Sequence, residues 1–122
     1  MAADDKVLIG QTHGSNDAEA VLIGYLLGVE ALRAGKEAVM WLTKDGIYLA
    51  TEGYSDALSV PDAPSIKDLH AEYIDKGGRF FACPVCVKTR KLEAANWVKG
   101  ADVKGAPSVY EFTQGGALVF NY

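Results

Sequence analysis

Apolar residues gather in short runs along this chain, and polar or glycine-rich turns separate the runs. Three runs show no polar alternation, and they lie at residues 6–12, 37–43 and 79–83. Such runs are typical of strands that are buried on both faces of a parallel sheet. Weaker runs at residues 101–104 and 117–121 predict a fourth and a fifth strand.

Helical patterns fill the segments between these strands. A helix is predicted over residues 17–34, with capping residues in the turn 13–17 and a stop at Gly35. Ser65 caps a second predicted helix over 66–76, which Gly77 ends. Residues 85–97 and 107–114 are also predicted to be helical, and 47–50 to form a short helix. Residues 53–64 form a long loop, of a length often linked to function.

The first predicted helix is apolar nearly all round. A helix that packs on a sheet needs only one apolar stripe along its length. In this helix Ile23, Leu27 and Ala31 extend the stripe to a second face. We therefore expect the second apolar face to pack against another subunit.

Strands that alternate with helices indicate an α/β fold of three layers with a mostly parallel five-stranded sheet. The length of 122 residues is that of a single domain spanning residues 1–122. In such sheets, ligands and chemistry collect at the carboxyl ends of the strands. The loops that follow the first three strands are therefore the places to search for function.

Composition and charge exclude several classes of function. The formal net charge is −4, without a basic cluster, so we expect neither nucleic acid nor a membrane as a partner. No apolar stretch is long enough to span a bilayer. Residues 1–5 lack the features of a signal peptide, so a cytoplasmic protein is expected. Neither a phosphate-binding loop nor a dinucleotide fingerprint is present, and we expect no cofactor.

Polar and sulfur-containing side chains follow each of the first three predicted strands. His13 and Asn16 follow the first strand, Asp45 the second, and Cys83 and Cys86 the third. We expect these residues to converge on one rim. His13 has two readings that carry equal weight: a proton-transfer role, or a loop histidine bonded to backbone.

The only two cysteines, Cys83 and Cys86, are the main candidates for chemistry. Cys83 ends a predicted strand, and Pro84 suits the first position of a helix, so Cys83 is a plausible N-cap. A thiol at that position faces free N–H groups and the positive end of the helix dipole, which lower its pKa. Lys88 and Arg90 follow nearby and would add to this effect.

Other interpretations of the two cysteines stay open at this stage. They are also consistent with two buried small apolar residues. A zinc site is disfavoured, because four ligands are needed and the chain offers one cysteine pair, His13 and His70. His70 is interpreted as a solvated residue in the middle of a helix. A glutaredoxin-like redox pair would follow the first strand, whereas this pair follows the third.

Three segments together resemble the DsrE/DsrF-like family of small sulfur-handling proteins. The first is the opening strand, polar turn and long apolar helix that ends with residues 31–39. The second is residues 41–49, in which a strand leads into an Asp-Gly turn and an apolar helix. The third is Phe81-Ala82-Cys83, with a helix that reaches Arg90. The resemblance covers nearly the whole chain.

This resemblance implies a flavodoxin-like α/β/α sandwich that assembles as a homo-oligomer, a trimer or a hexamer. In sulfur-relay members one cysteine at the end of the third strand carries sulfane sulfur as a persulfide, and that position is Cys83 here. Cys86 is an addition to the single-cysteine pattern. Lys91 stands where the family usually has a glycine, so the end of the third helix is expected to differ.

The expected function is that of a sulfur carrier or a sulfurtransferase-like protein, with sulfur donor and acceptor proteins as partners. Cys83 would be the nucleophile and Cys86 a resolving thiol, with His13, Asn16 and Asp45 on the rim of the site. Two alternatives are a thiol–disulfide switch of Cys83 and Cys86, and an oligomeric interaction protein without catalysis. Whether the protein is an enzyme stays open.

Overall fold

Five parallel strands form one sheet in the computed structural model, which describes residues 5–122. The order across the sheet is β4-β3-β2-β1-β5. The predicted α/β class with a parallel sheet is therefore confirmed. The expectation about a signal peptide falls mainly on residues 1–4, which lie outside the described residues. The strands are β1 (Lys6–Gln11), β2 (Glu37–Leu42), β3 (Arg79–Ala82), β4 (Ala101–Val103) and β5 (Leu118–Asn121).

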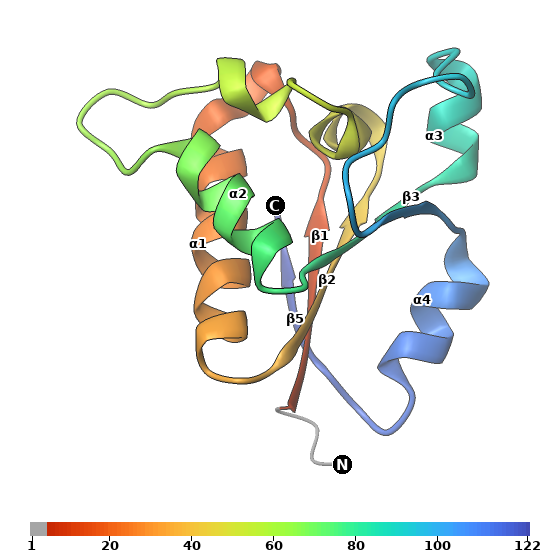
Figure 1. Cartoon of the computed structure of the whole chain (residues 1–122). Coiled ribbons are helices and arrows are strands. Elements are labelled where there is room, and N and C mark those ends of the chain that lie inside the picture. The colour runs from red at the N-terminus through yellow and green to blue at the C-terminus, as the bar shows by residue number, and fades with distance from the viewer. Residues whose placement is uncertain (1–4) are drawn as a thin grey trace.

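Helices lie on both faces of the sheet and make the molecule three layers thick (Figure 1). The helices α1 (Ala18–Arg33) and α2 (Ile66–Asp75) cover one face, and α4 (Ala106–Thr113) covers the other. The short helix α3 (Pro84–Thr89) directly follows β3. Three 3₁₀ segments complete the fold: η2 (Ser15–Asp17), η3 (Lys44–Ala50) and η4 (Ser55–Ala57). Among the described residues, no helix is long and apolar enough to cross a membrane.

Local capping chemistry explains where the two longest helices begin and end. The Asp17 side chain accepts a hydrogen bond from the backbone N–H of Ala20 at 3.0 Å, and Ser65 accepts one from Asp68 at 3.2 Å. Gly35 and Gly77 follow the helices with φ angles of 80° and 88°, a conformation that side chains other than glycine rarely adopt. The predicted capping residues and stops are thus confirmed.

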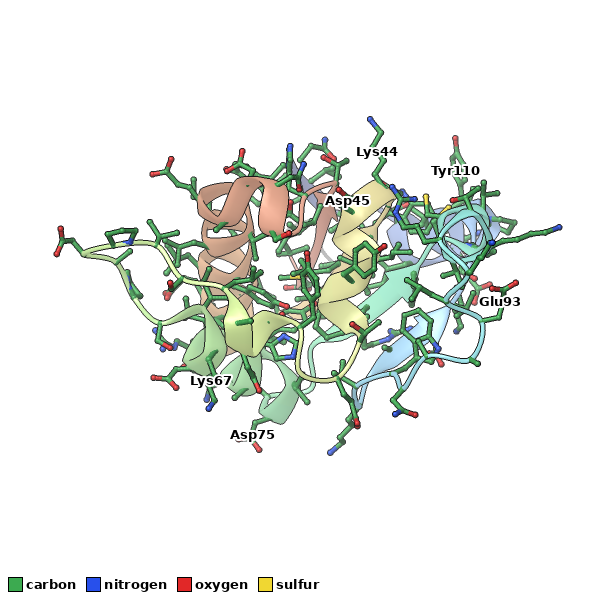
Figure 2. All side chains as sticks on the ribbon, turned by 90° about the horizontal axis from the view of Figure 1, so that it is seen from above. Lys44, Asp45, Lys67, Asp75, Glu93 and Tyr110 are labelled. Carbon is green, nitrogen blue, oxygen red and sulfur yellow. The ribbon has the colours of Figure 1, made fainter. Side chains whose placement is uncertain are left out.

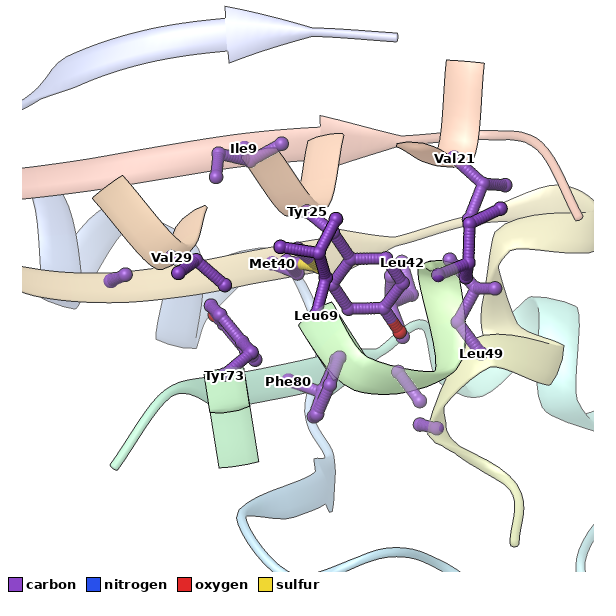
Figure 3. Packing of buried hydrophobic residues seen from close by; sticks show 14 of the residues in the cluster. Ile9, Val21, Tyr25, Val29, Met40, Leu42, Leu49, Leu69, Tyr73 and Phe80 are labelled. Atoms are coloured by element: carbon purple, nitrogen blue, oxygen red, sulfur yellow. The ribbon is translucent and has the colours of Figure 1, made fainter. Parts of the chain in front are cut away.

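The main core lies between the sheet and the layer of α1 and α2 (Figure 3). Alternate residues of the strands, such as Ile9, Met40 and Phe80, point into it, and Tyr25 and Tyr73 fill it from the helices. A much smaller cluster of Leu8, Val39 and Phe81 lies on the opposite face under α4. The two faces of the sheet are therefore covered very unequally.

Part of the apolar surface of α1 is covered by α2. The helix α2 packs against α1, and the approach is close at Gly28, where an added Cβ would come 2.8 Å from Tyr73. Ile23 and Leu27, which widen the apolar stripe, stay partly exposed, whereas Ala31 is buried. Whether another subunit covers the second apolar face stays a prediction. Leu26 is the large apolar residue of α1 that stays exposed, at 40%.

The third predicted helix is much shorter than residues 85–97. It ends at Thr89, and Lys91 has a left-handed φ of 56°, while Leu92 donates its N–H to Val87 O at 3.0 Å. This reversal is typical of helix C-termini and usually uses a glycine. The chain then runs back across the molecule, where Trp97 forms a bridge with Thr51. Lys91, at the position where the family usually has a glycine, therefore takes the left-handed conformation of this turn.

Candidate functional site

The register of the sheet places the residues after β1, β2 and β3 at one edge. Gln11 pairs with Leu42, and Leu42 pairs with Ala82, so the three strands end at the same level. Figure 2 looks down onto this carboxyl edge, with Lys44 and Asp45 labelled above η3. The predicted site residues follow these strand ends directly, so the expected rim exists.

Cys83 is the N-cap residue of α3, as predicted. Its N–H donates to Leu42 O at 3.0 Å, which extends the pairing of β3 by one residue. Its carbonyl accepts from Val87 N at 2.9 Å, and Pro84 occupies the first turn of the helix. The Cys83 side chain makes no capping hydrogen bond, so its half-buried sulfur is not tied to the helix N–H groups.

Cys86 lies one helical turn after Cys83 and faces it. The two thiols are close enough for Cys83 to affect the pKa of Cys86, and the backbone N–H of Lys44 donates to Cys86 Sγ at 3.1 Å. Lys44 has a left-handed φ of 51°, at the first residue of η3. Both cysteines are free thiols and are partly buried. The pair is thus a local dithiol that contacts the loop after β2.

The surroundings of Cys86 favour its protonated form. Burial is the main cause that raises the pKa of the Cys86 thiol, and the neighbouring Cys83 adds to the rise. The Lys44 N–H and the Arg90 charge act in the opposite direction and lower this pKa. The balance is a raised pKa, so the Cys86 thiol holds its proton more tightly than a free thiol does.

An ion pair joins the loop after β2 to the helix that carries Cys86. Arg90 donates to Asp45 Oδ1 through Nε at 3.1 Å and through Nη2 at 3.0 Å. Gly46 follows Asp45, and an added Cβ there would lie 2.1 Å from the carbonyl oxygen of Gln11. Asp45 therefore lies on the rim as predicted, held between the end of β1 and α3.

The loop after β1 bonds mainly to itself. Gln11 Oε1 accepts from the backbone N–H of His13 at 3.1 Å, and Thr12 Oγ1 lies 3.2 Å from His13 Nδ1. Asn16 Oδ1 accepts from Gly14 N at 2.9 Å. These hydrogen bonds hold His13 and Asn16 within the loop, and they do not involve a thiol. The structure thus brings Cys83, Cys86 and Asp45 together, and it shows His13 and Asn16 bonded within their own loop.

His70 was wrongly interpreted as a solvated residue. It is only 7% exposed, and its Nδ1 lies 2.6 Å from the hydroxyl of Tyr25, which is itself 3.3 Å from Ser55 Oγ. The physical reason is that position 70 lies on the apolar stripe of α2 with Ile66 and Tyr73. The periodicity of that helix was the signal that could have identified His70 as buried.

Two contributions to the site were harder to find from the sequence. The Lys44 contact uses a backbone group of a left-handed residue, for which the side-chain pattern carries no signal. The charge of Arg90, and not that of Lys88, lowers the pKa of the Cys86 thiol. Which of the two cations lies near the thiol depends on the geometry of the helix. Within residues 5–122 the structure contains no group of three histidine, cysteine or acidic residues that could hold a metal ion.

Comparison with known proteins gives the family. The sequence profile of the DsrE/DsrF-like family matches residues 5–122. The chain belongs to the DsrE/DsrF-like family. This assignment supports the sulfur-relay theme that the sequence suggested, at the level of the family.

The chain is similar in sequence to two uncharacterised archaeal proteins. The chain is 26% identical over 108 residues to an uncharacterised protein of Methanocaldococcus jannaschii, with 88% of this chain and 39% of that protein covered. It is 30% identical over 74 residues to an uncharacterised protein of Methanopyrus kandleri, with 60% of this chain and 57% of that protein covered. The chain therefore spans about two fifths and somewhat over half of these two proteins' lengths.

Two solved structures share the whole fold at low identity. The YchN protein of E. coli is similar with a TM-score of 0.76 and 11% identity, over 98% of this chain and 99% of that chain. A conserved protein of unknown function from Bacteroides thetaiotaomicron is similar with a TM-score of 0.62 and 16% identity, over 100% of this chain and 98% of that chain. At these identities the likeness concerns the fold.

Proposed function

We propose that this DsrE/DsrF-like protein is a cytoplasmic sulfur carrier that holds sulfane sulfur as a persulfide on Cys83. The observation that carries this proposal is the pair of free, partly buried thiols at the start of α3, in which Cys83 is the N-cap residue and the raised pKa of Cys86 keeps the second thiol protonated. A protonated neighbour that donates to a sulfur stabilises negative charge on that sulfur. Cys83 is therefore the better nucleophile of the two, and its partly buried sulfur keeps access to solvent.

The loading step is a sulfur transfer between thiolates. The Cys83 thiolate attacks the outer sulfur of a persulfide donor, the donor's S–S bond breaks, and the donor leaves as a thiolate. A new S–S bond on Cys83 forms, so no external oxidant or reductant is required. This step obeys the rules of thiol–disulfide exchange, in which thiolate fraction and access both set the rate.

Cys86 gives the loaded site a second possible fate. If the Cys86 sulfur attacks the Cys83 sulfur, the outer sulfur leaves as hydrosulfide with the Cys86 proton, and a Cys83–Cys86 disulfide remains. A dithiol reductant would then restore the reduced pair. His13, Asn16 and Asp45 are proposed as rim residues that meet the donor or acceptor protein, with Asp45 the nearest to the thiols in the contact network.

A thiol–disulfide switch is the second candidate function. The contact between Cys86 and Cys83 favours it, because two thiols this near each other are suited to a disulfide. In that case Cys83 and Cys86 would cycle between dithiol and disulfide without carrying sulfur.

The test is intact-mass measurement after the reduced protein meets a persulfide donor. The wild type, Cys83→Ser and Cys86→Ser are compared. We expect a gain of one sulfur atom in the wild type and in Cys86→Ser, and none in Cys83→Ser. A loss of two hydrogens in the wild type would identify the switch only if Cys86→Ser gains no sulfur; with a sulfur gain in Cys86→Ser, the same loss reports resolution of the persulfide by Cys86. No mass change in any of the three would contradict both functions.

A further inference from the structure

A polar hollow lies on the second face of the sheet, beneath α4, and the thiol chemistry described above does not use it. Its volume is about 170 Å³, and it opens to solvent between β3, the end of β4 and α4. Its lining combines two cations, one hydroxyl, one carboxylate and two aromatic rings: Arg79, Phe81, Lys104, Ser108, Glu111 and Phe112.

The aromatic ring of Phe81 makes cation–π contacts with both Arg79 and Lys104. The ring is 2% exposed. The Arg79 guanidinium carbon lies 5.1 Å from its centroid, and Lys104 Nζ lies 5.3 Å from the same centroid. The negative face of an aromatic ring attracts each cation. One ring therefore gathers two positive charges that would otherwise repel each other.

The negative charges around the hollow compensate these cations only in part. Asp102 lies 4.0 Å from Lys104 Nζ, which is the outer limit of an ion pair, and both side chains are exposed. Glu111 lines the hollow and is an exposed residue of α4. The planar fork of Arg79, the ammonium of Lys104 and the hydroxyl of Ser108 supply N–H and O–H donors that suit the oxygens of a small anion.

The hollow adjoins the Cys83 end of β3. The hydrogen bond from Cys83 N to Leu42 O continues the strand pairing, so the strand alternation places Cys83 on the same face as Phe81. Lys104 N donates to Ala82 O at 3.1 Å. The next residue, Gly105, approaches Pro84, whose Cδ would lie 3.7 Å from an added Cβ. Cys83 itself does not line the hollow, but Phe81 precedes it by two residues, about 7 Å along the strand, and Lys104 bonds to the residue between them.

We propose that this hollow binds the oxyanion group of a small sulfur donor of the thiosulfate type. The proposal rests on the proposed function of Cys83 and adds a substrate class to it. The Cys83 thiolate attacks the sulfane sulfur, and the bond from that sulfur to the sulfonate sulfur breaks. The electron pair of the broken bond leaves with sulfite, and Cys83 keeps the sulfane sulfur as a persulfide.

The two cations would act on the leaving group. Negative charge on the sulfonate oxygens increases as sulfite departs, so a guanidinium and an ammonium that contact these oxygens stabilise the transition state more than the bound donor. A neutral sulfur donor gains nothing from them. Dependence on the charge of the donor is therefore the signature of this site.

The experiment measures by intact mass the rate at which Cys83 is loaded, as a gain of one sulfur atom from thiosulfate and as a mixed disulfide from a neutral organic trisulfide, whose leaving group is an organic persulfide. Arg79→Gln and Lys104→Gln are compared with Lys88→Gln, a matched control that removes a cation from α3 outside the hollow. We expect Arg79→Gln to lower the second-order rate constant of loading from thiosulfate by about 10-fold or more, the usual effect of losing a charged hydrogen bond. Lys104→Gln should act in the same direction, and Lys88→Gln should change neither rate by more than about 2-fold.

The neutral donor separates a binding role from a structural one. Equal losses with both donors, or no loss of the thiosulfate rate in either hollow variant, would overturn the proposal. If no donor loads Cys83 in the wild type, the proposed function fails. Sulfite binding then tests separately whether the hollow is an anion site. In that case, shifts of the Lys104 and Ser108 amide signals on sulfite titration that vanish in Arg79→Gln support the site, and an absence of shifts overturns it.

Discussion

Cys83 and Cys86 show how position alone gives two identical side chains different roles. Cys83 sits at the junction of β3 and α3, where its sulfur lacks a capping hydrogen bond. Cys86 lies inside the first turn, packed against the main core and hydrogen-bonded by Lys44 N–H. Burial therefore acts on Cys86 and raises the pKa of its thiol. This difference in surroundings supports the proposal that Cys83 is the residue that reacts.

His70 is a second residue whose surroundings set its protonation. Burial is the main cause that lowers the pKa of His70 below its ordinary value of 6.5, and Asp56 opposes this in part. Tyr25 is also buried, which raises the pKa of its hydroxyl far above the ordinary value. Tyr25 therefore keeps its proton and can donate it to the neutral Nδ1 of His70.

We expect the free energy of unfolding to depend on pH through His70. Above 6.5 the histidine is neutral in both states, and the stabilising contribution is complete. As pH falls below this value the unfolded chain takes up a proton first, so stability decreases until the folded pKa is reached. Urea unfolding at several pH values between about 8 and about 5 should show this decrease in the wild type and lose this component in His70→Gln. Identical pH profiles for the two proteins would contradict this role.

At the scale of elements, η3 and α3 behave as one unit. The Lys44 N–H contact and the Asp45–Arg90 ion pair both connect them, and Gly46 allows η3 to lie against the end of β1. The helix α3 is only six residues long, too short to hold a rigid position by itself. The orientation of the two thiols therefore depends on the contacts of η3.

Arg90→Gln tests this connection through the reactivity of Cys86. The variant removes a charge that lowers the pKa of the Cys86 thiol, so that pKa should rise further. In a Cys83→Ser background we expect slower alkylation of Cys86 at a fixed pH. The free energy of unfolding should fall by no more than about 1 kcal/mol, because the ion pair is partly exposed.

The control for this variant is Lys88→Gln, which removes a cation from the same helix without touching Asp45. Its alkylation rate should match that of the parent protein. If both substitutions slowed alkylation equally, general charge near α3 rather than the Arg90 contact would be responsible.

The sequence predicted most of these elements, because their signals are local. The three apolar runs became β1 to β3, and the residues Asp17 and Ser65 cap α1 and α2 as expected. The length of α3 was mispredicted, because residues 90–97 carry helix-compatible side chains but bond to residues 45–52 instead: Arg90 donates to Asp45, and Asn96 O accepts from Glu52 N. The position of Cys83 was predictable from Pro84, whereas the contact of Lys44 with Cys86 depends on the tertiary fold.

At the scale of the whole molecule, the sheet is covered fully on one face and sparsely on the other. The edge strand β5 is exposed along its length, with Leu118 at 41% and Val119 at 52% exposed. Tyr110 of α4 is 76% exposed and points away from the molecule in Figure 2. An open apolar edge strand is a surface that proteins normally cover or pair.

We propose that a second copy of the chain covers β5, as part of the trimer or hexamer expected from the family. Val119→Lys should therefore lower the native mass measured by light scattering after gel filtration. Val103→Lys, an exposed valine on the opposite edge strand β4, is the matched control and should leave the mass unchanged. A wild-type protein that elutes as a monomer would contradict this proposal.

The strand order has a consequence for how the chain folds. The sheet pairs β1 with β5, so Val7 and Leu118 are neighbours, and the hydrogen bond from Thr12 to Tyr122 O joins residues 110 positions apart. Contacts of such long sequence separation are slow to form, because a large loop must close first. During synthesis on the ribosome, β1 would therefore wait with one apolar edge open until β5 emerges. That interval is the stage at which the nascent chain is most exposed to aggregation and most in need of a chaperone.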